Sequence, residues 1–491
     1  MSRTVNEEVR SVAFVSLGCP KNLVDSERML GLLAGDGLVV TPDHEQADAI
    51  VINTCGFLEA SKIESMAEIR QAVALKKAGK VKRVVVAGCL VQRHKTKLLA
   101  DEPGIDKLVG VFDREHIVEA VRGEYNPRQG EEGHYLGKYH DLSRELAERA
   151  GLDPGAKQTK TTRLPVFEDD RARLRLTPRH YAYLRISEGC NQGCAFCTIP
   201  SIRGLMRSKP VEQILLEAKE LAADGAVELN LIGQDTTSFG TDISYGPGLS
   251  GLLKTLDKQM KDVHWLRLMY AYPSCFTDEM IKTIADSDRV VKYIDMPLQH
   301  ISDRLLTVMK RRVTGREIRT LLEKLRKWVP GITIRTTFIA GSPTETDAEH
   351  NELVDFVRDF GFEMMGVFPY SAEPGTPMGR MEGQLTDEVK QARVEELMLV
   401  QQEVAFKKAA SLRGETIEVL VDRPAGRDVE EDGWVARHAG QAPDIDSSTI
   451  VHGGGLHAGM LTRVEVVGAG GYDLYAQVPK KKGRGLTVIK G

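Results

Sequence analysis

Three cysteines near the middle of the chain are spaced C-x3-C-x2-C. They are Cys190, Cys194 and Cys197, and they come shortly after a strand-like run at residues 181–186. Three thiolates in so short a loop can bind three irons of a cubic 4Fe-4S cluster, whereas a cluster closed by protein ligands takes four. The fourth iron would stay open to a small molecule that brings its own donor atoms. The spacing therefore predicts an iron–sulfur cluster with one ligand-binding iron.

The same spacing, with Phe196 before the last cysteine, resembles the signature of radical S-adenosylmethionine (SAM) enzymes. This resemblance implies that SAM chelates the open iron and is cleaved there by one electron to a 5'-deoxyadenosyl radical. The cofactor would supply this chemistry, and the protein would position it. The alternative is a structural zinc loop, whose fourth ligand would have to be a histidine such as His180, His264 or His300. Structural zinc sites more usually have two C-x2-C-like pairs, and no second pair exists here.

A second set of three cysteines lies in the N-terminal quarter of the chain, where each follows a strand-like run. Residues 11–18 precede Cys19, residues 49–54 precede Cys55, and the run ending at Gly88 precedes Cys89. Helix-like segments alternate with these runs, which predicts a parallel sheet with helices on both faces. Ligands of such sheets gather at the carboxyl ends of the strands, so we expect the three thiols to be neighbours that can hold a second cluster with one open iron. The alternative is three unrelated buried cysteines, since a free cysteine packs as a small hydrophobe.

The residues around these cysteines resemble the N-terminal domain of the methylthiotransferases in the segments 18–27, 53–57 and 88–90. In that family the three cysteines carry an auxiliary 4Fe-4S cluster whose open iron holds sulfur or methylsulfide. The resemblance implies this role for Cys19, Cys55 and Cys89. The Cys-Pro-Lys-Asn and Cys-Gly-Phe sequences resemble the branch that modifies ribosomal protein uS12. The branch that modifies tRNA tends to show Cys-Gln-Met-Asn and Cys-Ser-Val.

The central part of the chain repeats a strand and a helix about six times. This pattern predicts a partial (β/α)6 barrel with its active site at the carboxyl ends of the strands. The expected strands are 181–186, 227–232, 265–270, 291–296, 332–339 and 364–368. Polar residues follow three of these strands, and carboxylates or amides there can bind the amino and ribose groups of SAM. The candidates for contact with SAM are Gln234, Asp235, Gln299 and Glu345.

The segment Pro200-Ser201-Ile202-Arg203-Gly204 resembles a motif of the same family. An arginine there can hold a carboxylate with two hydrogen bonds, either that of SAM or that of a substrate aspartate, so Arg203 is the candidate catalytic residue. The segment Gly341–Glu345 departs from the family, since it reads Gly-Ser-Pro-Thr-Glu where Gly-Phe-Pro-Gly-Glu is usual. We expect the departure to affect the packing of this loop and not the fold.

The C-terminal part is rich in glycine and short β-like runs, and it resembles the TRAM domain, a small barrel of the OB type that often binds RNA. Residues 415–479 contain eleven acidic residues, four arginines and no lysine, a net charge of −7. Such a field would repel a phosphate backbone and attract a basic ribosomal protein. The segment Ala442–Asp446 also resembles the branch that acts on uS12. We therefore expect no direct binding of nucleic acid.

With 491 residues, of which 42% are hydrophobic, the chain is long enough for about three domains of roughly 150 residues. The expected units of this multidomain α/β chain are an N-terminal methylthiotransferase domain, a linker, a radical SAM domain, a TRAM domain and a basic tail, at 1–125, 126–179, 180–412, 413–480 and 481–491. A short helix is expected at 142–150. Arg171, Arg173, Arg175 and Arg179 are expected to form a solvated basic face.

Seven cysteines are too few for a disulfide framework, so we expect reduced thiols, with Cys275 as a plain core or surface residue. No run approaches the roughly 18 apolar residues of a membrane span, and the start of the chain is charged. The sequence therefore predicts a soluble cytoplasmic protein without a membrane partner. The net charge of −4 indicates no global basic field for nucleic acid.

The hypothesis that combines these features is a radical SAM enzyme with two 4Fe-4S clusters that adds a methylthio group to the β-carbon of an aspartate in uS12, free or in the small subunit. The family implies two uses of SAM, one as methyl donor to sulfur and one as radical source. One alternative keeps the chemistry and changes the substrate to N6-isopentenyladenosine in tRNA. Another is a non-catalytic ribosome or RNA adaptor whose cysteines hold zinc. The sulfur donor and the electron donor stay open.

Overall fold

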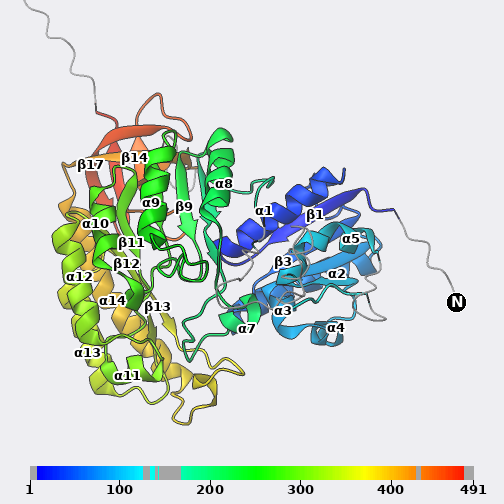
Figure 1. Cartoon of the computed structure of the whole chain (residues 1–491), viewed down its shortest axis with the longest axis horizontal. Coiled ribbons are helices and arrows are strands. Elements are labelled where there is room, and N and C mark those ends of the chain that lie inside the picture. The colour runs from blue at the N-terminus through cyan, green and yellow to red at the C-terminus, as the bar shows by residue number, and fades with distance from the viewer. Residues whose placement is uncertain are drawn as a thin grey trace, which may run out of the picture.

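The structure is a computed structural model that describes residues 8–124, 133–138, 142, 167, 169–426 and 433–479. These residues form a five-stranded sheet, a six-stranded sheet and a closed five-stranded barrel, in chain order, together with one two-stranded ribbon (Figure 1). The arrangement confirms the predicted multidomain α/β fold class. None of the helices in the described residues has the length and apolar character needed to cross a membrane.

The N-terminal sheet is parallel and has the strand order β2-β1-β3-β4-β5. Its strands are β1 (Ser11–Ser16), β2 (Val39–Thr41), β3 (Ala49–Thr54), β4 (Arg83–Gly88) and β5 (Lys107–Val109). The helical segments around it are α1 (Pro20–Gly35), α2 (Glu59–Lys77), α3 (Cys89–His94), α4 (Lys97–Asp101), η1 (Val111–His116) and α5 (Ile117–Arg122). Every residue of β3 is buried because apolar clusters pack on both faces of the sheet. The short edge strand β2 was not predicted, since a three-residue run carries too little periodicity.

The central sheet is also parallel, and its order β13-β12-β11-β10-β9-β6 follows the chain from one edge to the other. The strands are β6 (Tyr181–Arg185), β9 (Glu228–Ile232), β10 (Trp265–Leu268), β11 (Val290–Asp295), β12 (Thr333–Ala340) and β13 (Met364–Pro369). All six predicted strands are present, with ends shifted by one or two residues. The consecutive order confirms the partial (β/α)6 barrel, because each right-handed crossover places the next strand beside the last.

Helices cover the outer face of this sheet (Figure 1). They are α8 (Val211–Ala223), α9 (Gly248–Gln259), α10 (Asp278–Asp286), α12 (Gly315–Trp328), α13 (Asp347–Phe360) and α14 (Asp387–Ser411). The shorter segments η2 (Pro273–Cys275), α11 (Asp303–Val308) and η3 (Met378–Arg380) follow β10, β11 and β13 in the chain. Thr314 and Glu317 form a capping box that starts α12, and Thr346 and Glu349 start α13 in the same way. The largest apolar cluster of the protein lies between these helices and the sheet.

The C-terminal strands close into a barrel of order β14-β15-β16-β18-β17. They are β14 (Thr416–Pro424), β15 (Gly433–His438), β16 (Thr449–His452), β17 (Leu461–Gly470) and β18 (Asp473–Gln477). This barrel covers the end of the central sheet at which the strands begin (Figure 1). The cysteine loop leaves the opposite end, where the strands finish.

Acidic residues of the C-terminal barrel are used at this contact. Asp444 accepts hydrogen bonds from the hydroxyl groups of Tyr181 and Tyr183, at 3.0 to 3.2 Å. Asp446 accepts one from Tyr293 at 2.7 Å and pairs with Arg335 at 3.2 Å. The segment expected to help attract a basic ribosomal protein is therefore turned inward. The negative field outside the barrel is therefore weaker than a net charge of −7 suggests, because these two carboxylates are engaged inside the protein.

The segment before the central sheet corrects another expectation, since its arginines do not all form a solvated face. The side chain of Arg173 is only 2% exposed and lies beside Glu27 and Glu217, at 3.4 and 3.1 Å. Arg175 is 6% exposed, while Arg171 lies near the surface with Asp169. Buried carboxylates on α1 and α8 draw Arg173 inward. The helix expected at 142–150 and the basic tail lie outside the described residues, apart from residue 142.

Candidate active site

The first cysteine set occupies the loop after β7 (Ser187–Glu188), which pairs with β8 (Arg207–Ser208). The backbone N–H of Cys190 donates to Gly204 O at 3.2 Å, and the N–H of Cys197 donates to Cys194 O at 3.1 Å. Burial raises the pKa of the Cys190 thiol to about 11 and that of Cys197 to about 12, and the neighbouring Cys194 acts in the same direction. Three thiolates this close to one another require a bound cation.

The second set is assembled from three separate places. Cys19 precedes α1, Cys55 follows β3, and Cys89 begins α3. The neighbouring glycines let these places converge. Gly18 has a φ of +91°, and a Cβ there would lie 2.9 Å from the Cβ of Cys55. Gly88 has a φ of +95°, and a Cβ there would collide with the side chain of Asn53.

The Cys89 thiol is the most enclosed of the six cysteines expected to bind clusters. Burial raises its pKa to about 12, Arg203 opposes this, and Cys19 and Cys55 raise it further. β1 and β4 are the two neighbours of β3, and a Cβ on Gly18 would lie 3.3 Å from Cys55 Sγ, so the strand ends that carry the three thiols converge as expected. This convergence was predicted from the alternation of strands and helices, since the three cysteines are far apart along the chain.

The zinc alternative requires a histidine as the fourth ligand. No three His, Cys, Asp or Glu side chains in the described ranges are arranged around one ion-sized site. Of the histidines considered, His180 Nε2 lies 2.8 Å from Asp422. His300 Nδ1 accepts a hydrogen bond from Ser302 N–H, while its Nε2 is buried without a partner in the described residues.

Arg203 connects the two cysteine sets. It lies on α7 (Ile199–Arg203), which packs against α3 between the N-terminal domain and the central barrel (Figure 1). Its Nη2 donates to Cys89 Sγ at 3.1 Å, and its Nη1 contacts Asp25 at 2.6 Å and Glu188 at 3.2 Å. Glu188 directly precedes the first cysteine loop. Nη2 also donates to Asn22 Oδ1 at 3.1 Å, so both terminal nitrogens have partners within the protein, and only 2% of the residue is exposed.

Asp25 on α1 anchors this contact from the N-terminal side. Its carboxylate pairs with Arg114 at 2.7 Å, Arg185 at 2.8 Å and Arg203 at 2.6 Å. Burial alone would raise the pKa of Asp25, but the three guanidinium groups outweigh burial and lower it. Asp170 extends the network, since it pairs with Arg114 and Arg185. The two domains are therefore joined through buried ion pairs directly behind the cysteines.

Arg311 lies beside the first cysteine set, although no motif in the sequence pointed to a role for it there. Its Nη1 is 3.6 Å from Cys194 Sγ, its Nη2 donates to Pro297 O, and its guanidinium lies 4.1 Å from the centre of the Tyr272 ring. The residues on either side, Lys310 and Arg312, both have positive φ. Such strained backbone is typical of functional positions.

Lys21 reaches across from the N-terminal domain to the mouth of the central barrel. Its Nζ lies 3.1 Å from the centre of the ring of Tyr270, which follows β10. Burial acts to lower the pKa of Lys21, but Tyr270, Cys19 and Glu188 outweigh burial and raise it. Tyr270 has a positive φ of 59°. Lys21 belonged to the family motif, although the sequence gave it no role of its own.

The four candidates for contact with SAM all lie at the expected strand ends. They differ in whether their polar side-chain atoms already have hydrogen-bond partners within the protein. Gln234 donates to Glu188 Oε1, while its own Oε1 is buried without a partner in the described residues. This acceptor fits an ammonium group of a ligand. Gln299 is half-buried and has a φ of +74°.

The other two candidates are committed to the protein. Asp235 accepts from Gln192 at 2.6 Å and from Thr237 Oγ1 at 2.6 Å, so it holds the cysteine loop in place. Glu345 accepts from Ser342 N–H at 2.8 Å and pairs with Arg393 at 2.9 Å. These contacts indicate that both carboxylates position loops around the site.

The departure from the family motif is visible in the same loop as Glu345. Thr344, which stands where the family has glycine, has a φ of +63°. Its N–H donates to Gly383 O at 2.9 Å, and its own oxygens accept hydrogen bonds from Arg304. The loop keeps a glycine-like backbone because these contacts hold the strained residue.

Cys275 is nearer to the site than expected. Its Sγ lies 3.4 Å from Gln192 Nε2 and 3.6 Å from Ser238 Oγ. Gln192 belongs to the cysteine loop, so Cys275 supports that loop from behind. It is half-buried and forms no disulfide.

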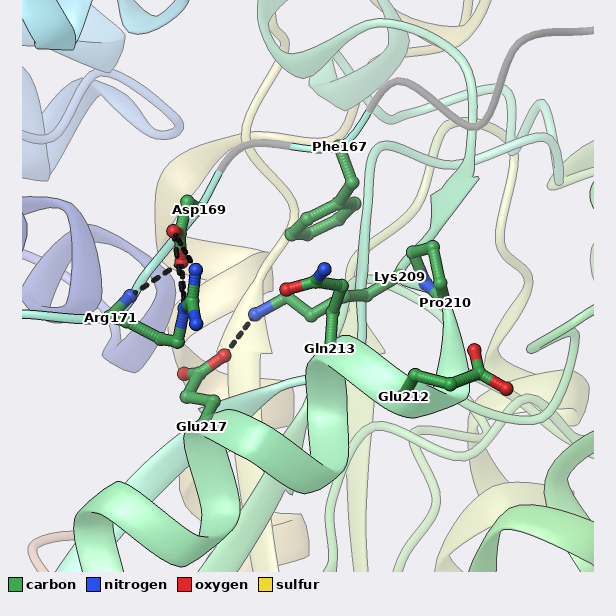
Figure 2. A pocket seen from close by; sticks show the side chains of 8 residues that line it. All are labelled: Phe167, Asp169, Arg171, Lys209, Pro210, Glu212, Gln213 and Glu217. Carbon is green, nitrogen blue, oxygen red and sulfur yellow. Dashed lines mark hydrogen bonds and ion pairs between the residues drawn. The ribbon is translucent and has the colours of Figure 1, made fainter. Parts of the chain in front are cut away.

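A pocket of about 380 Å³ lies beside the ion-pair network, at the start of α8. Figure 2 shows Lys209 reaching toward Glu217 there, with the ring of Phe167 4.7 Å from the Lys209 Nζ. The lining includes Asp169 and Arg171 and none of the cysteines. The pocket is therefore separate from the six thiols.

Comparisons with known proteins divide the chain in the same way as the fold. Residues 11–110 match the model described as uncharacterized protein family UPF0004, residues 184–357 match the radical SAM superfamily, and residues 414–478 match the TRAM domain. Among solved structures, the radical SAM methyltransferase TsrM from Kitasatospora setae, with cobalamin and a 4Fe-4S cluster bound, has a TM-score of 0.53 at 15% identity and covers 76% of this chain and 77% of its own. This likeness supports the fold alone.

Curated relatives extend over nearly the whole chain. Ribosomal protein uS12 methylthiotransferase RimO of Anaeromyxobacter sp. (strain Fw109-5) is 42% identical, over 97% of this chain and 95% of its own length. The RimO proteins of Bdellovibrio bacteriovorus and Geobacter sulfurreducens are 40% and 38% identical, over 96% and 95% of this chain and 97% and 98% of their own. The chain therefore belongs to the ribosomal protein uS12 methylthiotransferase family, a family of radical SAM enzymes that use 4Fe-4S clusters and SAM.

Proposed function

We propose that this protein adds a methylthio group to the β-carbon of one aspartate in ribosomal protein uS12. Cys190, Cys194 and Cys197 would hold the cluster that binds SAM, and Cys19, Cys55 and Cys89 would hold the auxiliary cluster. When bound, the clusters and SAM would supply the sulfur, the methyl group and the radical that removes the hydrogen. An unactivated C–H bond requires such a radical, because no acid or base in the site could make that carbon reactive by proton transfer.

The observation that carries this proposal is the contact between the two cysteine sets through Arg203. Its guanidinium contacts Cys89 of one set and Glu188, which adjoins the loop of the other. The residues of this chain thereby hold both sets at one domain boundary and exclude water with a buried ion-pair network. From the sequence, Arg203 was expected to bind the carboxylate of SAM or of the substrate. We instead propose that it positions the two cysteine sets, because its terminal nitrogens already have partners in the protein.

The strand-end residues would then orient SAM. Gln234 would accept a hydrogen bond from the SAM amino group with its unpartnered Oε1, and Gln299 would lie beside it at the next loop but one. Asp235 and Glu345 would act by fixing the loops. We also propose domain bounds of 1–125, 126–179, 180–412, 413–480 and 481–491, which the three sheets support.

The test is anaerobic incubation of the reconstituted protein with SAM, sulfide, a reductant and either unmodified uS12 or hypomodified tRNA, followed by mass spectrometry. We expect a methylthio adduct on one uS12 aspartate that is lost in Cys194→Ala. An adduct on N6-isopentenyladenosine of tRNA alone would overturn the substrate. A colourless protein with no adduct on either substrate would favour the zinc-bound adaptor.

A further inference from the structure

Lys21 is a buried cation without a matching anion. Three lysines of the described residues are buried, namely Lys21, Lys209 and Lys390. Lys209 pairs with Asp170 and Glu217, and Lys390 pairs with Asp387. Lys21 has no carboxylate within ion-pair distance in the part of the chain that the structure describes. Its ammonium group lies against the ring of Tyr270 and forms no ion pair in these residues, so it can still bind a ligand that carries a negative charge.

The position of Lys21 restricts what this ligand can be. Lys21 lies two residues after Cys19, and its Nζ lies over the ring of Tyr270 at the carboxyl end of a barrel strand. It thus extends from the second cysteine set toward the mouth of the barrel that carries the first. Asp295 accepts a hydrogen bond from Tyr270 N–H at 3.2 Å, and Tyr270 O accepts one from Thr236 N–H at 3.1 Å. The aromatic platform under the ammonium group is therefore held rigidly in its strained backbone conformation.

We propose that Lys21 binds the carboxylate of the substrate aspartate and makes the site specific for an acidic side chain. This inference rests on the proposed function. The carboxyl carbon of aspartate is bonded directly to the β-carbon. If Lys21 Nζ holds the carboxylate, the β-carbon is held one bond from the carboxyl carbon. It would then lie between the radical source in the barrel and the sulfur source beside Cys19. Arg203 does not fill this role, because Asp25 and Glu188 already occupy its guanidinium.

The first experiment measures binding of uS12 to the cluster-loaded protein under anaerobic conditions. Wild-type uS12 is compared with uS12 in which the modified aspartate is replaced by asparagine. We expect the unmutated enzyme to prefer the aspartate form by about 10-fold to 100-fold in Kd, the range of a hydrogen bond to a charged group. Lys21→Met keeps the length of the side chain and removes the charge, so its Kd ratio should fall to about 1. Lys21→Arg should retain most of the preference.

A second measurement separates ligand binding from a structural role. Thermal unfolding of the apoprotein should give Lys21→Met a Tm at or above that of the unmutated chain, because an unpaired buried charge is removed. Lys209→Met is the matched control, and it should lower the Tm because it removes one cation from the buried ion pairs of Asp170 and Glu217. Iron content should be unchanged in Lys21→Met.

Two outcomes would overturn the inference. If Lys21→Met keeps the preference for aspartate, Lys21 does not bind the substrate carboxylate. If Lys21→Met weakens the binding of both forms of uS12 equally and lowers the Tm, Lys21 has a structural role. In either case the unmutated enzyme would still modify uS12, so the proposed function would stand. If the unmutated enzyme neither binds nor modifies uS12, the proposed function fails and the specificity assigned to Lys21 fails with it.

Discussion

The loop of Cys190, Cys194 and Cys197 and the strand ends of Cys19, Cys55 and Cys89 gather the same donor set by different means. In the loop, the spacing along the chain limits the distances between sulfurs, and backbone hydrogen bonds within the loop complete the geometry. At the strand ends, only the pairing of β1, β3 and β4 brings the thiols together. The first set therefore depends on local chemistry, and the second depends on the whole N-terminal domain.

The arginines beside the two sets differ in the same way. Arg203 beside Cys89 is neutralised by Asp25 and Glu188, whereas Arg311 beside Cys194 has no carboxylate within ion-pair distance in the described residues. Arg311 instead stacks on Tyr272 and donates to a backbone carbonyl. The arginine beside the barrel set therefore has no ion-pair partner in the described residues, whereas the arginine beside the strand-end set has two. This difference indicates that Arg203 helps to hold the N-terminal domain against the central barrel.

The largest effects should come from removing one thiol of each set. Cys55→Ala and Cys197→Ala should each bind about four fewer of about eight irons per chain, because each removes one cluster. Cys197→Ala should lose cleavage of SAM, whereas Cys55→Ala should keep that cleavage and lose the methylthio product. Iron analysis and mass spectrometry of the products check this. A full iron complement in Cys55→Ala would contradict the assignment of the second set.

Asp25→Asn should separate the two sets by breaking the network behind them. Loss of this charge leaves Arg114, Arg185 and Arg203 poorly compensated, and we expect a cost of about 3–5 kcal/mol in the free energy of unfolding. Because the pKa of Asp25 is lowered in the folded protein, its contribution is present above about pH 4 and is lost as pH falls further. Urea unfolding of the apoprotein at pH 7 measures it.

Asp36→Asn is the matched control for this change, since Asp36 forms a partly exposed pair with Arg122. Its cost should stay below about 1 kcal/mol. Equal costs for the two variants would show that the buried network does not hold the domains together.

Two glycine substitutions sharpen the contrast between local and tertiary placement. Gly88→Ala should cost about 2–4 kcal/mol, because the residue has positive φ and a Cβ would collide with Asn53. Gly193→Ala in the barrel loop has a φ of +66° with open space around it, so it should cost about 1 kcal/mol. Urea unfolding and iron content are the measurements. A larger loss of iron in Gly193→Ala than in Gly88→Ala would reverse the comparison.

The smallest effect concerns His300, which is buried at a barrel strand end. Burial lowers its pKa from 6.5 to about 3. As pH falls below 6.5, the unfolded chain takes up a proton that the folded chain does not, so stability falls by about 1.4 kcal/mol per pH unit. His300→Gln should remove this contribution to the pH dependence between pH 6.5 and 5.5, as followed by urea unfolding of the apoprotein, while His438, whose pKa burial lowers to about 4, keeps its own. The exposed His457→Gln should leave it intact, and equal slopes in both variants would contradict the prediction.

The sequence predicted the architecture well because the strands are long, apolar and separated by amphipathic helices. The strand Ala49–Thr54 has the predicted bounds. It predicted the solvated arginine face wrongly, since Arg173 is buried against carboxylates that lie far away along the chain. It also did not foresee that Asp444 and Asp446 face the central barrel, because charge counted along a segment does not show which way a side chain points.

The sequence by itself determined the chemistry of the donors, since cysteine spacing and motif residues are local properties of the chain. Tertiary structure alone decided which charges meet the sulfurs. Arg203, Arg311 and Lys21 reach their places through contacts between residues more than a hundred positions apart, such as Arg203 with Cys89 and Lys21 with Tyr270. Periodicity and spacing carry no information about such pairings, because long-range contacts are selected by packing of whole domains.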